Sequence, residues 1–429
     1  MLTAITGINW GDEGKGRMVD LISQEYDIVA RYQGGNNAGH TVKNERGKFV
    51  LNLLPSGILR PNVVCVMGNG MVIDPHHLDG EINKLREQGI EITPANLKIS
   101  DRATITMPYH VEQDGLEEAR LSKTGAQFGS TKRGIAYAYG DKYMKKTLRM
   151  GDLLHLDDAV KKRLVTMVDS KNLVMEGSYN AAPISVDEMW AWLEKYAAIF
   201  KDYICDVGQY LADADAAGKK VLFEAQLGAL RDIDFGIYPY TTSSNVIGAY
   251  APIGAGIPGH KLHNSIGVMK AYSSCVGDGP FAAELAMTEE EKHALREAGH
   301  EYGAATGRPR RVGPIDLVAS RYGVFCQGCD EVALTLLDVL DYMEKIPMVT
   351  AYKLTDGTTT RFPMGEALDT AQPVVEYLPG WHCDITAARK WEDLPQQTRD
   401  YVEYLEKAVG CKITYISVGA EREAYIHRG

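Results

Sequence analysis

The chain lacks the features that mark several classes of protein. Its 429 residues include only seven cysteines, an odd number spread along a long chain, which argues against a disulfide framework. No stretch approaches the roughly 18 uncharged apolar residues of a membrane span, and no basic N-terminal region indicates a secretory signal. No block rich in lysine and arginine is present, which argues against a nucleic-acid scaffold. We therefore expect a cytoplasmic protein with reduced thiols, without membrane or nucleic-acid partners.

The composition is that of a globular protein with an acidic balance. Hydrophobic residues make up 45% of the chain and charged residues 24%, and the formal net charge is −11. Because the overall field repels anions, any anionic ligand must be held by locally placed groups.

The order of the expected elements predicts an α/β fold. We expect strands at residues 2–6, 28–32, 49–54, 63–67, 97–100, 221–224, 266–270, 332–335, 348–353 and 413–418. We expect helices at residues 78–88, 157–168, 185–210, 289–298, 314–322 and 395–409. Apolar strands that alternate with amphipathic helices indicate a mostly parallel central sheet covered by helices on both faces. Without repeats or linkers, residues 1–429 are read as a single domain, with a mostly helical insertion at 105–220.

A glycine-rich loop follows the first strand and has the sequence Trp10-Gly-Asp-Glu-Gly-Lys-Gly-Arg17. Its glycines let a phosphate approach the backbone N–H groups at the start of a helix, and Lys15 supplies a positive charge. The spacing is too short for the usual P-loop, and no Ser or Thr follows the lysine. Asp12 would repel phosphates unless it binds a metal or takes a proton. The alternative is a simple strand-to-helix turn with solvated charges.

A second loop, Gly34-Gly-Asn-Asn-Ala-Gly-His-Thr41, follows the next expected strand. Both loops should therefore lie at the carboxyl-end crevice of the sheet. A lone histidine is more often structural, but the small residues around His40 let its ring reach a ligand. We interpret Asp12 and His40 as an acid–base pair over a phosphate site.

Three later segments carry polar groups suited to anions. They are Gly129-Ser-Thr-Lys-Arg-Gly-Ile135, Tyr238-Pro-Tyr-Thr-Thr-Ser-Ser-Asn245 and Thr306-Gly-Arg-Pro-Arg-Arg311. Taken singly, each is better explained by a turn or a solvated charge run than by a ligand site. Cys326 and Cys329 form a lone CxxC, which we read as reduced structural thiols rather than a zinc site.

With these segments in this order, the chain resembles the adenylosuccinate synthetase family from residue 4 to about residue 423. Further segments that carry the resemblance are residues 53–59, 232–245, 276–281, 337–341 and 416–419. The resemblance implies the family's P-loop-like GTP-binding ligase fold. It also implies ligation of IMP with L-aspartate to adenylosuccinate through a 6-phosphoryl-IMP intermediate, driven by GTP. One Mg²⁺ per subunit and a homodimer are implied as well.

The resemblance assigns roles to individual residues of this chain. The catalytic residues would be Asp12 and His40, and the metal ligands would be Asp12 and the carbonyl of Gly39. The GTP-binding residues would be Gly11, Asp12, Glu13, Gly14, Lys15, Gly16, Arg17, Arg310, Leu336, Leu337, Asp338, Ser417, Val418 and Gly419. The IMP-binding residues would be Asp12, Glu13, Gly14, Lys15, Asn37, Ala38, Gly39, His40, Thr131, Gln226, Leu227, Thr242 and Arg308, with Lys145 reaching across from the other subunit. The aspartate-binding residues would be Ala304, Ala305, Thr306, Gly307, Arg308, Pro309 and Arg310.

The chain departs from the family's pattern at ligand-facing positions. Lys145 replaces an arginine, Leu227 a glutamine (with Gln226 one place early), Leu336 a lysine and Cys275 an arginine. The stretch that usually reads Gly-Ile-Gly-Pro is here 134–137, Gly-Ile-Ala-Tyr. Two alternatives stay open for this reason: the same chemistry on another purine monophosphate or with ATP, and a non-catalytic nucleotide-binding protein.

Overall fold

The computed structural model describes residues 1–44, 47–125, 129–302 and 309–428. In this part of the chain, a ten-stranded sheet has the order β20-β19-β15-β11-β1-β10-β2-β5-β7-β9. Its neighbouring strands run parallel except for β19 and β20 at one edge. The mostly parallel α/β fold predicted from the sequence is confirmed.

The described elements have the following bounds. The strands of the large sheet are β1 (Leu2–Gly7), β2 (Ile28–Arg31), β5 (Val64–Met67), β7 (Leu97–Ser100), β9 (Ile204–Cys205), β10 (Val221–Glu224), β11 (Asn264–Lys270), β15 (Glu331–Thr335), β19 (Lys412–Ser417) and β20 (Tyr425–His427). Smaller sheets contain β3 (His40–Asn44), β4 (Gly47–Leu51), β6 (Val72–Ile73), β8 (Thr104–Ile105), β12 (Ser273–Cys275), β13 (Arg311–Gly313), β14 (Ile315–Asp316), β16 (Lys345–Leu354), β17 (Gly357–Thr359) and β18 (Gln372–Pro379). The α-helices are α1 (Lys15–Ile22), α2 (Pro75–Glu87), α3 (Pro108–Ser122), α4 (Ile135–Met144), α5 (Asp158–Tyr179), α6 (Val186–Phe200), α7 (Val207–Ala216), α8 (Ala251–Ala255), α9 (Glu289–Gly299), α10 (Leu317–Gln327), α11 (Glu366–Asp369) and α12 (Gln396–Val409).

The central strands are buried on both faces, which is why their sequences are continuous apolar runs. All six residues of β1 are buried. Successive side chains of a strand point to opposite faces, so Ala4 packs in the cluster that includes α7 and α8, and Ile5 packs in the cluster that includes α1 and α2. Because these neighbouring strands run parallel, their carboxyl ends lie together along one edge of the sheet.

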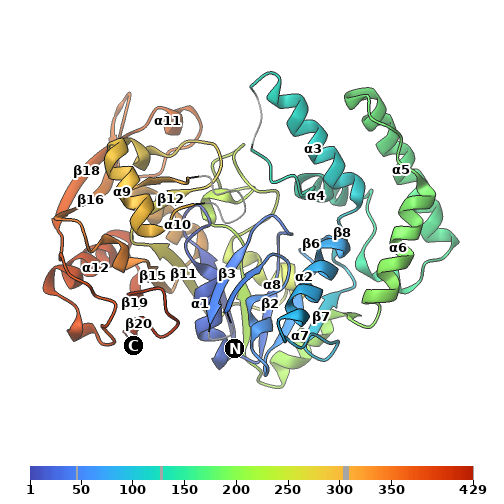
Figure 1. Cartoon of the computed structure of the whole chain (residues 1–429), viewed down its shortest axis with the longest axis horizontal. Coiled ribbons are helices and arrows are strands. Elements are labelled where there is room, and N and C mark those ends of the chain that lie inside the picture. Colours follow the sequence, from blue (N-terminus) through green and yellow to red (C-terminus); the bar gives the residue numbers. More distant parts are fainter. Residues whose placement is uncertain (45–46, 126–128, 303–308, 429) are drawn as a thin grey trace.

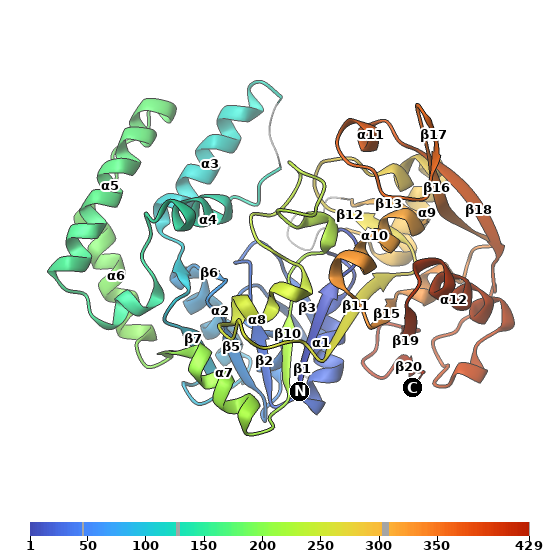
Figure 2. The same cartoon turned by 180° about the vertical axis from the view of Figure 1, so that it is seen from behind.

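The helices α3 to α6 form a group beyond the β7 side of the sheet, and the C-terminal elements lie on the opposite side (Figures 1 and 2). Residues 105–220 contain these helices, the strand β9 and α7. The reading of residues 1–429 as one domain stays a prediction.

The expected helix at 185–210 is wrong as a single element. Helix α6 ends at Phe200, the chain then pairs Ile204–Cys205 with β7, and α7 begins at Val207. The Asp206 carboxylate caps α7 by accepting the N–H of Gln209 at 3.0 Å. The pairing of Ile204–Cys205 with β7 and the Asp206 cap outweigh the helical periodicity of this segment. The periodicity carries no information about the pairing or the cap.

Other expected boundaries also moved. Residues 314–316 do not begin α10, because Ile315–Asp316 pairs with β16 and the Asp316 carboxylate caps a helix that starts at Leu317. The expected strand 49–54 ends at Leu51 and pairs antiparallel with β3. Helices α3 and α4 lie in the segment 105–220 that was expected to be mostly helical, although their bounds were not predicted, and α5 continues to Tyr179.

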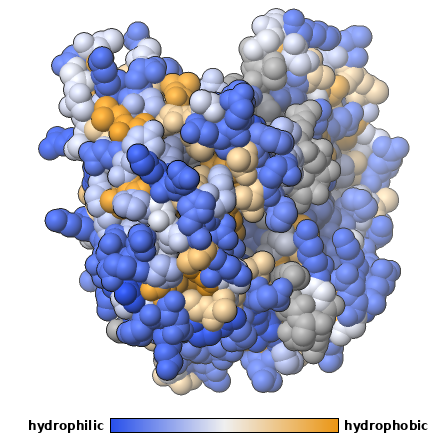
Figure 3. Space-filling model, turned by 60° about the vertical axis from the view of Figure 1, so that its left-hand side comes forward, coloured by the Kyte–Doolittle hydropathy of each residue, from blue (hydrophilic) through white to orange (hydrophobic). Residues whose placement is uncertain are grey.

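The face of the molecule in Figure 3 carries mainly hydrophilic residues, with apolar ones in small separate patches. No helix among the described residues combines the length and the apolar character that a membrane span needs.

Candidate active site

The glycine loop between β1 and α1 lies at the carboxyl edge of the sheet, as predicted. Gly11 and Gly14 have φ angles of +112° and +88°, which residues with a side chain rarely adopt. A side chain at Gly11 would also meet the Leu227 Cα at 2.8 Å. Because α1 begins at Lys15, the unpaired N–H groups of its first turn face the loop. The loop is therefore built as an anion site.

Glu13 shapes this loop from inside. Its Oε1 accepts the N–H of Asn9 at 2.9 Å and of Gly11 at 2.8 Å. Its Oε2 lies 2.8 Å from the Lys15 Nζ, which also donates to the Gly11 carbonyl at 3.0 Å. Both side chains are buried. The Glu13 carboxylate is thus engaged within the protein, and its backbone N–H is the group left for a phosphate.

Asp12 faces a pair of cations. Its Oδ2 lies 3.3 Å from the Lys270 Nζ and 3.8 Å from an Arg310 Nη, and it accepts the Ser274 hydroxyl. Burial opposes ionisation, but Lys270 and Arg310 outweigh it and hold the pKa of Asp12 below its ordinary value. Asp12 is therefore a carboxylate at neutral pH, and these three contacts all use Oδ2.

Asp12 fits the role of a magnesium ligand, because its Oδ1 takes part in none of the contacts just described. Within the described residues, no group of three or more His, Cys, Asp and Glu side chains could hold a metal ion alone. Mg²⁺ is usually bound by one or two carboxylates together with substrate phosphates, and Asp12 supplies one such carboxylate.

His40 is the first residue of β3 and its ring is held by a buried carboxylate. The Glu224 Oε1 lies 2.5 Å from Nδ1, and an Arg31 Nη lies 2.9 Å from the same nitrogen. Burial first, and then Arg31, lower the pKa of His40 to about 4, so the ring is neutral and its Nδ1–H donates to Glu224. The buried Nε2 has no partner among the described residues. A group that binds at this site therefore meets a ring nitrogen that is already oriented.

Glu224 and Arg31 were missed by the sequence analysis. Both are fully buried and 3.1 Å apart. Burial raises the pKa of Glu224, but Arg31 and His40 outweigh it and hold this pKa at about 2. Ser56 adds two contacts to the carboxylate at 2.7 Å, through its N–H and its hydroxyl. The available signal was a charged residue at the end of each of two apolar strands, since charges are almost never buried without partners.

Gly16 brings the two predicted catalytic loops into contact, and this gives a test. A Cβ at Gly16 would lie 2.7 Å from the His40 Cβ. Replacement of Gly16 with alanine should displace His40 and lower kcat by about tenfold or more, because misplacement by about 1 Å costs up to about 10²-fold. Steady-state kinetic assays that compare the kcat of Gly16→Ala with that of the wild type check this prediction.

The matched control is Gly80→Ala in α2, where no heavy atom lies within 4 Å of the added carbon. It should raise the free energy of unfolding by about 0.5–1 kcal/mol and leave kcat unchanged. A normal kcat in Gly16→Ala would show that His40 has room to shift without consequence.

On the predicted IMP side, the structure brings Asn37 and Thr242 together, with the Asn37 amide nitrogen 3.5 Å from the Thr242 hydroxyl. The Gln226 side chain is fully buried, and its amide donates to the carbonyls of Gly35 at 2.8 Å and Asn52 at 3.1 Å. The Gln226 amide nitrogen is thus occupied inside the protein, whereas its buried Oε1 has no hydrogen-bond partner among the described residues. Leu227 follows it with a φ of +61°, a backbone conformation unusual for leucine.

The predicted guanine-binding residues come together at the ends of β15 and β19. Leu336 has a φ of +59° and precedes a short helical turn that begins at Leu337. The Asp338 Oδ1 is buried without a hydrogen-bond partner in the described part of the chain, and burial raises the pKa of Asp338. The Arg17 guanidinium donates to the Ser417 hydroxyl at 2.5 Å, so it ties the glycine loop to this group of residues. A buried carboxylate oxygen without a partner needs a donor, and a base with N–H groups supplies one.

The remaining predicted residues are spread more widely. Residues 304–308 lie outside the described residues, whereas Arg310 donates to Glu301 at 2.7 Å. Thr131 is exposed in the loop before α4. Lys145 is exposed at the C-terminal end of α4 with a φ of +63°. No described contact links it to the other predicted residues within this single chain.

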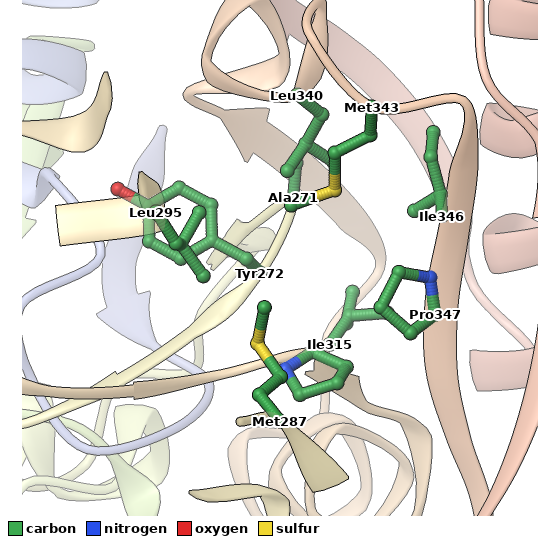
Figure 4. A pocket seen from close by; sticks show the side chains of 10 residues that line it. Ala271, Tyr272, Met287, Leu295, Ile315, Leu340, Met343, Ile346 and Pro347 are labelled. Atoms are coloured by element: carbon green, nitrogen blue, oxygen red, sulfur yellow. The ribbon is translucent and has the colours of Figure 1, made fainter. Parts of the chain in front are cut away.

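Two cavities do not coincide with these residues. One, of about 10 Å³, is apolar and lined by Tyr272, Met287, Leu295 and their neighbours (Figure 4). It has room for about one water molecule and no nucleotide. The other, of about 410 Å³, lies near the start of α7 and contains Arg102 and His260.

Taken together, the parallel sheet, the glycine loop at its carboxyl edge, the ionised Asp12 and the buried His40 are typical of an enzyme that acts on a phosphorylated substrate. Comparison with known proteins makes this specific. The chain belongs to the adenylosuccinate synthetase family, whose model matches residues 4–426, and it is therefore a ligase.

Relatives match along the whole chain. The adenylosuccinate synthetase of Caldanaerobacter subterraneus is 43% identical over 426 residues, which is 99% of this chain and 98% of the relative. That of Carboxydothermus hydrogenoformans is 44% identical over 423 residues, or 98% and 97% of the two chains. The fully ligated enzyme of Plasmodium falciparum is similar in structure, with a TM-score of 0.92, 34% identity, and coverage of 100% of this chain and 99% of that one.

A more distant structure shares the fold. The succinoaminodeoxyadenylate synthetase of cyanophage S-2L, bound to dGMP and dATP, matches with a TM-score of 0.60 at 18% identity. It covers 99% of this chain and 95% of that one.

Proposed function

We propose that this chain joins IMP and L-aspartate to give adenylosuccinate, with GTP hydrolysed to GDP and phosphate. Family membership supports the reaction. The observation that carries it to these residues is the presence, on two loops in contact through Gly16, of an ionised Asp12 and of a His40 whose Nε2 has no partner among the described residues.

Asp12 acts first, as a general base. The hydroxypurine oxygen is a poor leaving group and must be phosphorylated. Asp12 removes the N1 proton of IMP, so that O6 attacks the γ-phosphorus and GDP leaves. An ionised carboxylate is the form that this step needs. His40, oriented by Glu224, meets the transferred phosphoryl group through Nε2. With its proton on Nδ1 the neutral ring must first take up a proton on Nε2 before it can donate there, and the Glu224 carboxylate stabilises the positive charge that the ring then carries.

In the second step the amine of L-aspartate attacks C6, and phosphate leaves with the O6 oxygen. Arg310 lies at the edge of the predicted aspartate-binding residues and 3.8 Å from Asp12. A guanidinium there suits a carboxylate ligand, since Arg forms paired hydrogen bonds to carboxylates.

Mg²⁺ is the implied cofactor, one per subunit, and Asp12 with the carbonyl of Gly39 would hold it. When bound, it neutralises charge on the phosphates.

The cytoplasmic location stays a prediction.

The guanine preference follows from Asp338, whose unpartnered oxygen suits the N1 and N2 donors of guanine. Leu227 and Leu336 replace polar groups, and loss of a buried polar contact costs about 1–3 kcal/mol. These replacements weaken nucleotide binding. Guanine still has the N–H donors that suit Asp338.

A matrix of substrates tests the proposed function. IMP, GMP and dGMP are each combined with GTP or ATP, L-aspartate and Mg²⁺, and product is followed by ultraviolet absorbance. We expect the highest kcat/KM with IMP and GTP. A higher kcat/KM with another nucleotide pair would change the assigned substrates and leave the proposed chemistry as it is. Nucleotide binding without phosphate release from any pair would favour a non-catalytic protein.

We also propose a homodimer in which Lys145 reaches the IMP phosphate of the neighbouring site. A C2 interface would build two equivalent sites. Lysine is a point charge without the fork of arginine, so Lys145→Arg should lower the KM for IMP, and Lys145→Ala should raise it more than it lowers kcat.

Sedimentation with IMP present and steady-state kinetics check the dimer prediction. The control is Lys161→Ala, which should leave the KM for IMP unchanged. Lys161 also belongs to the group of helices α3 to α6, but its Nζ lies 5.3 Å from the centre of the Trp190 ring. A monomer at all concentrations, or an unchanged KM in both Lys145 variants, would show that Lys145 has no such role.

A further inference from the structure

A buried cluster of charges lies behind Asp12 and includes residues with no role so far. Lys270 is the last residue of β11, which pairs with β1. Its Nζ lies 2.6 Å from the Glu301 Oε1 and 3.3 Å from the Asp12 Oδ2, and it donates to the Ser274 hydroxyl. Only 4% of the Lys270 side chain is exposed. One ammonium thus holds two carboxylates where water hardly enters.

Glu301 fixes the other side of this cluster. Its two oxygens accept from Lys270, from the Tyr272 hydroxyl and, at 2.7 Å, from Arg310. The Lys270 ammonium lies 5.2 Å from the centre of the Tyr272 ring. Tyr272 also lines the apolar cavity of Figure 4, and its hydroxyl is held by the hydrogen bond to Glu301. Glu301 is 1% exposed, so its position is determined by these partners.

The sheet register adds a second anchor on the same loop. Lys270 and Thr335 are opposite each other on β11 and β15. The Thr335 hydroxyl donates to the Glu13 carbonyl at 2.7 Å, while Lys270 binds the neighbouring Asp12 side chain. Gly11, just before Asp12, has no side chain to restrict the backbone. The contacts of Lys270 and Thr335 therefore tie the Asp12–Glu13 segment of the loop to the ends of β11 and β15.

We propose that Lys270 is a positioning residue for Asp12. By holding Oδ2 it keeps the carboxylate from rotating and turns Oδ1 toward the reacting groups. Glu301 holds Lys270 in place and links it to Arg310, so the base and the cation for L-aspartate are set by one cluster. This inference rests on the proposed function, because it gives Lys270 a part in the same reaction.

The test is Lys270→Met, which removes the charge but keeps most of the volume. We expect kcat to fall by about 10²-fold, since a misplaced base costs about this much, while the KM values for GTP and IMP stay close to wild type. In Lys270→Ala, added n-propylammonium should restore part of kcat, and tetramethylammonium at the same concentration should not. A residue that only stabilises the fold would show neither the split between kcat and KM nor this rescue.

The matched control is Lys98→Met. Lys98 is a partly buried lysine on β7 that also lies over a tyrosine ring, 5.8 Å from the centre of Tyr210, but far along the sheet from Asp12. It should keep the wild-type kcat. If Lys270→Met does not fold because two buried carboxylates lose their partner, Lys270→Met with Glu301→Gln restores the charge balance of the cluster, and kcat should still be low.

Wild-type kcat in a folded Lys270→Met, or in the double variant, would overturn the role of Lys270. So would a loss in Lys98→Met as large as that in Lys270→Met. Absence of product from the wild-type protein, assayed in parallel, would instead refute the proposed function and with it this inference.

Discussion

Asp12→Asn should reduce kcat by about 10³-fold, within the range of about 10²–10⁴ that general-base catalysis contributes. Asparagine has nearly the same shape and still accepts the Ser274 hydroxyl, but it cannot take the N1 proton of IMP. The cations Lys270 and Arg310 keep the wild-type group ionised and therefore competent as a base. Calorimetry should show that the variant still binds GTP, because the loop N–H groups and Lys15 are unchanged.

A control separates loss of the base from loss of the fold. Asp157→Asn changes a carboxylate that caps α5 by accepting the N–H of Val160 at 2.9 Å. Asparagine caps helices about as well as aspartate, so stability and kcat should both stay at wild type. Near-normal turnover in Asp12→Asn would show that another group removes the proton.

The sequence predicted those parts of the fold that depend on local patterns. The central strands could be placed because continuous apolar runs of four to six residues need burial on both faces, as in β1 and β10. The break between α6 and α7 could not, because it depends on Ile204–Cys205 pairing with β7, more than a hundred residues earlier in the chain. Sequence periodicity reports which face of a segment is apolar, and it does not report which distant strand is its neighbour.

For the candidate site, the sequence indicated the loops and left out their supports. The glycine pattern is recognisable because Gly11 and Gly14 adopt positive φ angles and a Cβ at Gly16 would meet the His40 Cβ. Glu224 and Lys270 are the last residues of their strands, and each becomes part of the site only when β10 and β11 pair on either side of β1. Their partners are distant in the sequence, so no local spacing could connect them to His40 or Asp12.

His40→Asn should lower kcat by about 10²- to 10³-fold, the cost of losing one hydrogen-bonding group aimed at a transition state. Asparagine is too short to place a donor where the Nε2 lies. Glu224→Gln should lower kcat as well, because the ring loses the carboxylate that binds its Nδ1–H and stabilises positive charge on it. Glutamine has nearly the same shape, but it can donate its amide N–H to Nδ1. That contact favours the opposite tautomer of the ring, with the proton on Nε2 instead of Nδ1.

The two residues act as a unit in this account, and kinetics on the double variant test that. Once His40 is asparagine, changing Glu224 to glutamine should cost little more, because Glu224 acts through the ring that is already gone. His76→Asn is the control, since His76 bonds to the Tyr196 hydroxyl at 2.8 Å in contact with neither catalytic loop, and its kcat should match wild type. If the losses from His40→Asn and Glu224→Gln multiply in the double variant, Glu224 has a role of its own, and the orientation of His40 by the Arg31 and Glu224 pair is not what sets the rate.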